Sequence, residues 1–386
     1  MSRYEPSCAG ELAALLKERA SARQIIELAG CGSKSTMAGH VEAADAFIST
    51  KNLNKLLAYE PRDLTVSVGA GMEFRQLQSL LQENGQMIAL DPPFADKATI
   101  GGVVASNSSG PMRRAFGTAR DLVIGMTFAT LEGKLVECGG MVVKNVAGLD
   151  MGKLMIGSFG TLAAITSLNF RVHSLPEATE TYLFPHPELG DALKSRDRII
   201  TGVLQPTAVD LVSPAIALRL GFRGHLLAVR VGGRETLLAR YRKELSDGER
   251  LQGPDEGQFW SAIQEFPPGF LNEHSEGVVA RVSTTLSGIA QLPKTVAGSF
   301  ISRAATGVTY FYFGNWSLAA PWWRKVEEMG LPGVIEHAPV EIRRHQNLWS
   351  GGASSQEKAA FAMMEKVKQL FDPDRLLNPG RLHGRI

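Results

Sequence analysis

The stretch at residues 98–110, which reads ATIGGVVASNSSG, restricts the possible structures of this chain more than any other part of it. It contains Gly101, Gly102 and Gly110, and small hydroxyl and amide residues separate the last two. Glycine lets a backbone come within contact distance of a ligand, and a side chain at Gly101 or Gly102 would fill that space. Small polar residues add hydrogen-bonding groups without bulk, which suits a diphosphate or a flat ring. By itself, the stretch reads equally well as a plain loop between two elements.

A second candidate loop begins where the predicted strand 25–30 ends. Its sequence, CGSKSTMAG at 31–39, contains small residues whose consecutive N–H groups can point at phosphate oxygens. The loop lacks the G-x-x-x-x-G-K-[ST] spacing of a P-loop, and Ser35 stands where the G-x-G-x-x-G dinucleotide motif has its third glycine. The sequence is therefore compatible with an anion-binding loop outside these two motif classes, and an ordinary turn is the commoner interpretation of such a loop taken alone.

The size and charge of the chain limit its class. With 386 residues it is too long for one compact core, so two domains are expected. A formal net charge of +2 gives no reason to expect nucleic acid or an anionic membrane as a direct partner. No apolar run approaches the roughly 18 residues that cross a bilayer, and the N-terminus lacks a signal-peptide core. We therefore expect a cytoplasmic protein, with any membrane association made through a partner.

The three cysteines are Cys8, Cys31 and Cys138, which lie far apart in the sequence. A cysteine-ligated iron–sulfur cluster needs about four thiolates, so this chain cannot hold one by itself. If the chain passes electrons onward, another chain must carry them away.

Hydrophobic periodicity and turn residues predict a chain of mixed helices and strands. The residue before proline is driven out of the helical region, so Asp91 in the Asp91-Pro92-Pro93 sequence is predicted to be extended. In the second half, the pattern indicates a small antiparallel α+β domain. The predicted helices are 9–21, 73–85, 235–245 and 354–373, and the predicted strands include 46–50, 64–72, 161–172, 226–233, 277–286 and 308–316.

Six collinear motifs resemble the FAD-binding domain of the vanillyl-alcohol oxidase/p-cresol methylhydroxylase superfamily. Each is weak alone, but their shared order across almost the whole chain is specific. They are GCGSKS at 30–35, VSVGAGM at 66–72, DPPF at 91–94 with ATIGG at 98–102, FGTARDLVIGM at 116–126, KNVAGLDMGKLMIGSFGTLAAIT at 144–166, and FDPDRLLNPGRL at 371–382.

This resemblance implies an α+β fold. A p-cresol methylhydroxylase-type FAD-binding domain of two α/β subdomains would occupy 1–176. A small α+β cap domain, which would contact substrate or a partner, would follow at 177–350, and a C-terminal helix and tail returning to the flavin would occupy 351–386. The resemblance implies a dissociable FAD, because the loops at 33–36 and 104–109 lack the histidine that attaches flavin covalently in other members. Cys31, just before the first of these loops, is the only nucleophilic candidate for a covalent bond.

The resemblance also assigns cofactor-binding positions. The loop at 30–35 and the central stretch at 98–110 would hold the diphosphate and ribityl chain. The segment around Gly160 to Ile165 would meet the adenine, and Asn378 and Arg381 would return toward the flavin. The expected cofactor-binding residues are Gly30, Cys31, Gly32, Ser33, Lys34, Ser35, Pro92, Thr99, Ile100, Gly101, Gly102, Ser106, Gly110, Gly160, Ile165, Asn378 and Arg381.

Within the superfamily, the chain is most similar to the smaller flavin subunits of bacterial glycolate oxidases. That likeness implies oxidation of glycolate to glyoxylate, with hydride transfer to FAD and electrons passed to an iron–sulfur subunit beside a larger FAD-containing subunit. An electron-relay or supporting flavoprotein subunit is the alternative, and a single-chain alcohol or sugar oxidase is a weaker one.

The sequence does not identify a general base or a metal site. The H-x-G-D-G-N-x-H element of related 2-hydroxy-acid dehydrogenases is absent. His337, Glu341 and His345 have helical spacing, but Pro339 interrupts the helix that would bring them together. Other imidazoles lie outside any recognisable catalytic motif; they are His173, His225 and His274.

Overall fold

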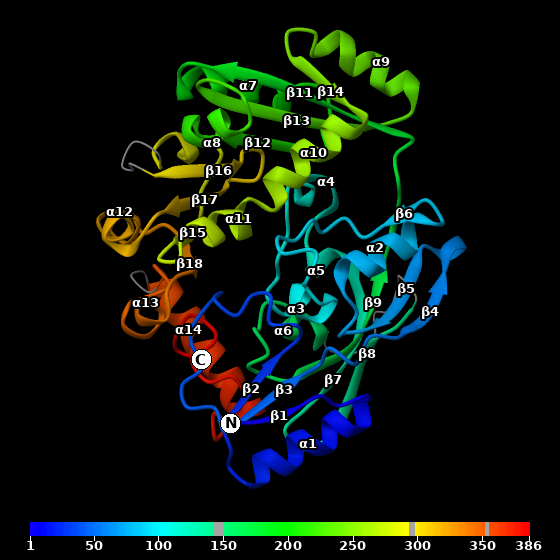
Figure 1. Cartoon of the computed structure of the whole chain (residues 1–386), viewed down its shortest axis with the longest axis vertical. Coiled ribbons are helices and arrows are strands. Elements are labelled where there is room, and N and C mark those ends of the chain that lie inside the picture. Colours follow the sequence, from blue (N-terminus) through cyan, green and yellow to red (C-terminus); the bar gives the residue numbers. More distant parts are fainter. Residues whose placement is uncertain (142–149, 293–297, 352–354) are drawn as a thin grey trace.

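The computed structural model describes residues 1–141, 150–292, 298–351 and 355–386, so the K-N-V-A-G part of the fifth motif lies outside the described residues. Figure 1 shows two parts: one holds the N-terminal helix and the smaller sheets, and the other is built on a large sheet. The C-terminal helix returns from the large sheet to the N-terminal part. In the described part of the chain, no helix is long and apolar enough to cross a membrane.

A parallel three-stranded sheet forms the start of the N-terminal part, in the order β1-β3-β2. Helix α1 covers it, because Leu12 and Leu16 pack against Ile26 and Ile48 in one buried cluster. The Cys8 side chain accepts a hydrogen bond from Glu11 N and so caps the helix. The elements are β1 (Ser2–Tyr4), α1 (Ala9–Ser21), β2 (Ile26–Ala29) and β3 (Ala46–Ser49).

An antiparallel five-stranded sheet, in the order β4-β5-β9-β7-β8, forms the rest of this part. Its core includes Val66 and Val68 of β5, which pack with Phe74, Leu77 and Leu81 on the apolar face of α2. A two-stranded pair, β10-β6, adjoins it. The strands are β4 (Leu56–Glu60), β5 (Thr65–Gly69), β6 (Gln86–Met87), β7 (Val123–Ala129), β8 (Leu135–Gly139), β9 (Ala164–Arg171) and β10 (His173–Ser174). The helices are η1 (Pro61–Asp63), α2 (Phe74–Gln82), α3 (Ile100–Ala105), α4 (Arg113–Phe116), α5 (Ala119–Leu122) and α6 (Gly152–Met155).

The large sheet is antiparallel, with eight strands in the order β14-β11-β13-β12-β16-β17-β15-β18. Side chains alternate between its faces: Leu227 and Val229 of β13 join one core cluster, and Leu226 and Ala228 join the other. Helices α7, α9 and α12 cover the first face, and α8, α10 and α11 cover the second. The strands are β11 (Ala178–His186), β12 (Ala208–Val212), β13 (His225–Gly233), β14 (Glu249–Gln252), β15 (Val278–Ser283), β16 (Ser299–Arg303), β17 (Val308–Phe313) and β18 (Gly333–His337). The helices are α7 (Leu189–Thr201), α8 (Pro214–Arg219), α9 (Glu235–Glu244), α10 (Gly253–Gln264), α11 (Phe266–Glu273), η2 (Gly288–Ala290), α12 (Trp316–Glu328), α13 (Val340–His345) and α14 (Ser355–Phe371).

A buried ion pair fixes the C-terminal segment to the N-terminal part. Lys368 Nζ lies 2.6 Å from Asp372 Oδ2 and donates to the backbone carbonyls of Thr161, at 2.7 Å, and Leu377, at 2.8 Å. The segment after α14 then runs beside β2, where Ile26 N donates to Leu376 O. The chain end thereby reaches the loop at 31–39, where Arg381 donates to the carbonyl of Lys34.

Two local predictions were wrong. Asp91 has a φ of 46°, in the left-handed region rather than the extended one, because its carboxylate accepts a hydrogen bond from Met112 N and Gly110 packs against its backbone. The central glycine stretch is also more than a loop, since Thr99 caps a short helix, α3, that begins at Ile100. The predicted domain limits at 176 and 350 stay a prediction.

Candidate functional site

The loop after β2 presents unused backbone donors to a pocket. The N–H groups of residues 31–34 have no acceptor among the described residues, while Ser35 N closes a turn onto Gly32 O. Gly32 has a φ of 72°, and nothing lies within 4 Å of where its side chain would be. A run of free N–H groups on such a turn is the arrangement that binds phosphate oxygens.

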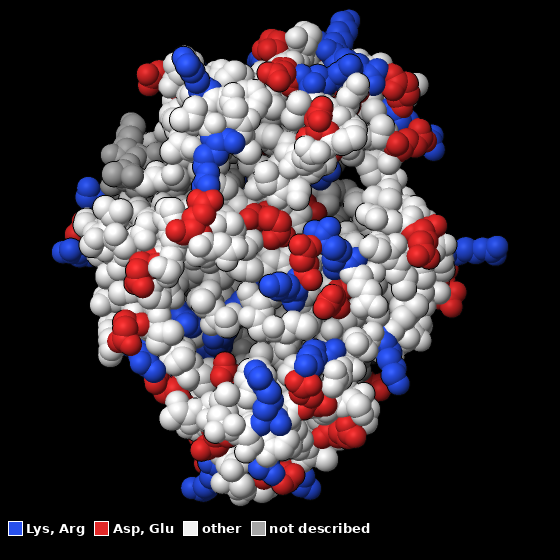
Figure 2. Space-filling view, viewed as in Figure 1, with Lys and Arg blue, Asp and Glu red and all other residues white. Residues whose placement is uncertain are grey.

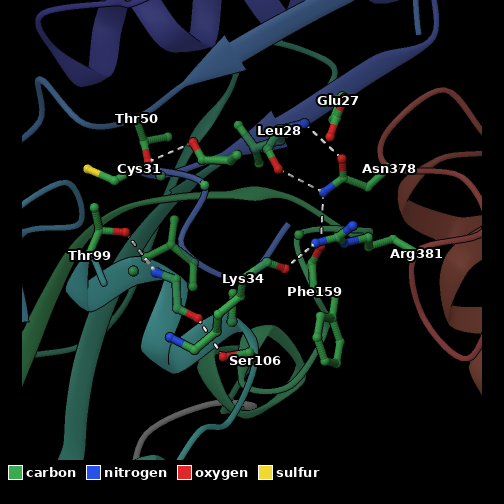
Figure 3. Close-up of a pocket in the computed structure, with 18 of the residues that line it drawn as sticks. Glu27, Leu28, Cys31, Lys34, Thr50, Thr99, Ser106, Phe159, Asn378 and Arg381 are labelled. Carbon is green, nitrogen blue, oxygen red and sulfur yellow. Dashed lines mark hydrogen bonds between the residues drawn. The ribbon is translucent and has the colours of Figure 1, made fainter. Parts of the chain in front are cut away.

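Two arginines hold the carbonyl groups of this loop. Arg381 donates to the carbonyl oxygens of Lys34, at 2.9 Å, Ser35 and Gly39, and Arg343 donates to those of Ser35 and Ala338. Guanidinium groups bind these carbonyls and hold the loop at the pocket that it lines, and Figure 3 shows Arg381 beside Lys34 there. Burial and the neighbouring Arg343 lower the pKa of Arg381 to about 10, so it stays charged at neutral pH. Arg381 therefore lines the pocket and positions the loop.

Lys34 places a cation without a partner at the same pocket. Its Nζ is buried and has no hydrogen-bond partner among the described residues. The nearest aromatic ring is that of Phe94, whose centroid lies 5.8 Å away. Burial lowers the pKa of Lys34 to about 8, although Glu265 and Glu336 oppose the shift. An orphaned buried ammonium group is costly unless a bound anion compensates it.

The central glycine stretch forms the second wall and differs from its predicted role. Ile100 N donates to Met72 O, Gly101 N to Ala70 O, and Gly102 N to Thr99 Oγ1. The first-turn N–H groups of α3 are therefore already used within the protein. The stretch contributes a close-packed surface to the pocket rather than free donors.

The glycines near this wall exclude side chains for different steric reasons. A side chain at Gly30 would place Cβ 2.1 Å from Thr99 Oγ1, so the two loops meet only because residue 30 is glycine. A Cβ at Gly101 would come within 2.8 Å of Ala70, which is in the protein core. Gly101 also lines the pocket, and the predicted steric exclusion of ligand by a side chain there stays a prediction. Gly102 lines the pocket, and its Cβ would meet Thr99 Oγ1 at 3.1 Å.

Asn378 forms the third wall together with the turn at Phe159 and Gly160. Its Oδ1 accepts from Leu28 N at 2.7 Å, and its Nδ2 donates to the carbonyls of Leu28, at 3.2 Å, and Phe159, at 2.9 Å. The amide is fully used in joining β2, the 159–160 turn and the C-terminal segment. Figure 3 shows Asn378 and Arg381 on one side of the pocket and Thr99 and Cys31 on the other.

Most of the expected residues meet at this pocket. The expected residues that line it are Gly30, Cys31, Gly32, Ser33, Lys34, Ser35, Thr99, Gly101, Gly102, Ser106, Gly160, Ile165, Asn378 and Arg381.

Three expected residues lie away from the pocket lining. The carbonyl of Pro92 accepts a hydrogen bond from Gln264, Ile100 is in the core, and Gly110 packs against Asp91. Their predicted contacts with cofactor stay predictions. Sequence reasoning missed eight lining residues, some on the strands β2 and β3 and some inside the quoted motifs, because apolar and strand residues carry no local sign that they face a pocket. They are Glu27, Leu28, Ala29, Phe47, Thr50, Ala105, Phe159 and Ala163.

The spaced His337, Glu341 and His345 lie on different elements. His337 ends β18 and is buried, whereas Glu341 and His345 are exposed on α13. His337 Nδ1 lies 3.0 Å from Thr36 Oγ1, and burial with the nearby Lys34 lowers the pKa of His337 to about 3. No group of three metal-ligating side chains occurs within the described ranges.

Comparisons with known proteins agree with the motifs. The model of the FAD binding domain family matches residues 3–139, and that of the C-terminal domain of FAD linked oxidases matches residues 353–382. The chain is 28% identical over 333 residues to glycolate oxidase subunit GlcE of Escherichia coli, covering 86% of this chain and 85% of that protein. It is 30% identical over 172 residues to D-lactate dehydrogenase of Anaerostipes hadrus, covering 44% of this chain and 36% of that protein.

The solved structure of p-cresol methylhydroxylase with substrate bound has the same fold. The TM-score is 0.77 at 13% identity, over 99% of this chain and 88% of that one. The chain therefore contains an FAD binding domain, matched at residues 3–139, and has the fold of p-cresol methylhydroxylase. Its cofactor is FAD, and it is an FAD-dependent oxidoreductase. The orphaned Lys34 ammonium and the free N–H groups of residues 31–34 fit the negatively charged diphosphate of this cofactor.

Proposed function

We propose that this chain is the FAD-binding subunit of an enzyme complex that oxidises a small 2-hydroxy acid, with glycolate as the first candidate. The observation that carries the proposal is the anion pocket, whose lining residues Lys34 and Arg381 have no salt-bridged carboxylate among the described residues. The near full-length likeness to a glycolate oxidase subunit supports the substrate class, and so does the likeness to a D-lactate dehydrogenase. Glycolate and lactate share a hydroxyl group beside a carboxylate.

The proposed binding mode assigns each wall a role. The loop at 30–35 binds the diphosphate, Arg381 and Asn378 hold that loop and β2 in place, and the wall of α3 packs against the cofactor. FAD is bound without a covalent bond in this proposal. When bound, it supplies the two-electron redox chemistry of the reaction. The cap at 177–350 would contact substrate or partner.

Partner subunits complete the proposed electron path. Cys8, Cys31 and Cys138 are free cysteines on separate elements, so an iron–sulfur centre must belong to another chain. We propose an iron–sulfur subunit and a larger FAD-containing subunit as partners. Figure 2 shows acidic and basic side chains mixed over the visible face, without a broad area of one sign. Such a surface fits a protein partner better than nucleic acid.

The experiment that tests the proposal is anaerobic titration of the FAD-loaded chain with glycolate, followed by absorbance near 450 nm. Bleaching is expected, because hydride transfer from a 2-hydroxy acid reduces the flavin. D-lactate serves as the second 2-hydroxy acid, and acetate, which lacks the hydroxyl, is the control. A yellow protein that stays oxidised until partner subunits are added is instead an electron-relay subunit, and this outcome contradicts the proposed activity of the chain itself.

A further inference from the structure

A second pocket adjoins the first and lies between the two parts of the molecule. The pockets share Ser106 and Phe159, and the second extends to β15, β18 and the C-terminal tail. Its cavity volume is about 150 Å³, and a cavity of this size holds a benzene-sized molecule. Its lining combines a few polar groups with apolar side chains. The lining residues are Met37, Ala38, Ser106, Asn107, Gly157, Phe159, Arg281, Val334, Ile335, Glu336, Leu348, Leu382 and His383.

Arg281 is held so that one edge of its guanidinium remains available. Its Nε donates to Glu336 Oε1 at 2.6 Å, which fixes the side chain between β15 and β18. Its two terminal nitrogens have no hydrogen-bond partner within the described part of the chain, and 32% of the side chain is exposed. Carboxylates bind arginine through two parallel hydrogen bonds to such a free edge. Glu336 is only 13% exposed, so it orients Arg281 while facing little solvent.

His383 lies near the C-terminus, about a hundred residues after Arg281, and lines the same pocket. Its ring stacks on Trp349, with centroids 4.9 Å apart and planes at 19°. The terminal turn, in which Arg385 N and Ile386 N both donate to Leu382 O, holds it there with a φ of 57°. Its ring nitrogens have no hydrogen-bond partner among the described residues. Burial, together with the charges of Arg281 and Arg385, lowers the pKa of His383 to about 4. At neutral pH the imidazole is therefore uncharged, with one nitrogen free to accept a hydrogen bond.

We propose that this second pocket binds the 2-hydroxy acid itself, with Arg281 holding the carboxylate and His383 accepting a hydrogen bond from the hydroxyl. The inference rests on the proposed function for its substrate class. Next to the FAD pocket, the Arg281 guanidinium is a fixed cation and the His383 imidazole is a neutral hydrogen-bond acceptor. They match the carboxylate and the hydroxyl, which glycolate carries on adjacent carbons. Ile335, Leu348 and Leu382 form apolar walls that favour small acids over sugars, which need many more hydrogen-bonding partners.

The test measures binding separately from turnover. FAD-loaded protein is reduced with dithionite under nitrogen, so that glycolate cannot be oxidised, and glycolate and acetate are titrated by calorimetry. The wild type is expected to bind glycolate more tightly than acetate. Arg281→Met should weaken both ligands about 10- to 100-fold, in line with the loss of a charge-assisted hydrogen-bonded pair. His383→Phe keeps the stacking on Trp349 but should remove the preference for glycolate, with acetate binding changed less than about 3-fold.

Controls separate this inference from loss of fold and from failure of the proposed function. Arg240→Met, on the exposed face of α9, should leave both affinities unchanged. Arg281→Lys keeps a positive charge beside Glu336 and replaces Arg281→Met in the test if that variant does not fold. It should still weaken carboxylate binding, because an ammonium group lacks the two terminal nitrogens that bind both carboxylate oxygens. The pocket assignment is overturned if the Arg281 variant that folds binds both acids with wild-type affinity and His383→Phe keeps the wild-type preference for glycolate. An absence of wild-type bleaching by glycolate and by D-lactate overturns the proposed function, whatever the calorimetry shows.

Discussion

Lys34 carries a buried positive charge for which the described residues offer no hydrogen-bond partner. Glu265 and Glu336 lie close enough to influence its pKa but make no hydrogen bond to it. Buried, unpaired charges are retained mainly where a ligand completes them. At the scale of single residues, Lys34 is therefore the strongest local sign that the pocket binds an anion.

The charge of Lys34 predicts a pH-dependent affinity for FAD. In the FAD-free protein, the ammonium is charged below its pKa of about 8 and loses its charge as the pH rises through that value. Because the diphosphate binds the charged form, affinity should be constant below pH 8 and decline above it. At pH 7, Lys34→Met should weaken binding about 10- to 100-fold, the value of one charge-assisted hydrogen bond. Fluorescence titration with FAD between pH 6.5 and 9.5 measures both effects.

Two outcomes would contradict this role of Lys34. One is an FAD affinity that is the same in Lys34→Met as in the wild type at pH 7. The other is an equal decline in affinity above pH 8 in both proteins. Lys97→Met is the matched control, because Lys97 is exposed on a neighbouring loop and should leave the affinity unchanged.

At the scale of secondary-structure elements, the long C-terminal helix α14 depends on one buried cation. Val367 and Phe371 pack against the core of the five-stranded sheet, and Lys368 lies between them. The ammonium of Lys368 joins the Asp372 carboxylate to two backbone carbonyls, and Asp372 also accepts hydrogen bonds from Leu376 N and Leu377 N. This network sets where the chain turns back toward β2, and hence where Asn378 and Arg381 lie.

Lys368→Met should lower the free energy of unfolding by about 3–5 kcal/mol, because it leaves Asp372 as a buried charge without its cation. Urea denaturation followed by circular dichroism measures the loss. Lys366→Met, two residues earlier on the exposed face of α14, should change stability by less than about 0.5 kcal/mol. Equal stabilities for the two variants would show that the ion pair does not secure the helix.

At the scale of the whole molecule, the part built on the large sheet is joined to the N-terminal part by polar contacts. Glu265, between α10 and α11, accepts hydrogen bonds from Phe94 N at 3.0 Å and Ala95 N at 2.9 Å. Its neighbour Gln264 donates to Pro92 O at 2.8 Å. Across the molecule, Ala38 N donates to Glu336 O at 2.8 Å. These contacts place β18, with Glu336, beside the loop that carries Lys34.

Glu265→Ala should loosen the segment that follows Asp91 without unfolding the chain. Two backbone N–H groups lose their acceptor, so amide hydrogen exchange at residues 92–97 should accelerate, and FAD binding should weaken by a few fold as the Phe94 ring beside Lys34 is released. Hydrogen exchange read by mass spectrometry makes the measurement. The same change at Asp255, which is exposed on α10, is the control. If amide exchange at residues 92–97 is unchanged in Glu265→Ala, the Glu265 carboxylate does not hold this segment in place.

Local sequence patterns predicted several elements of the N-terminal part. The helix at 9–21, the apolar face of 74–81 and the strand before the 31–39 loop were readable, because burial of one face imposes a periodic spacing on the sequence. The two loops were identified by residue types that bring backbone close to a ligand, and fourteen of the expected positions line one pocket. The order of the motifs added a resemblance to a superfamily of flavoproteins and hence predicted the cofactor, which the FAD binding domain match supports.

Tertiary structure decided which of these residues have free groups. Gly101 was predicted to make room for ligand, yet it makes room for Ala70; Arg381 was predicted to return toward the flavin, and it binds loop carbonyls. The pairing of Arg281 with His383, separated by a hundred residues of chain, carries no local sequence signal. A hydrogen-bonding group is available to a ligand only if no other segment occupies it. That depends on contacts between distant segments, which residue types and spacing do not record.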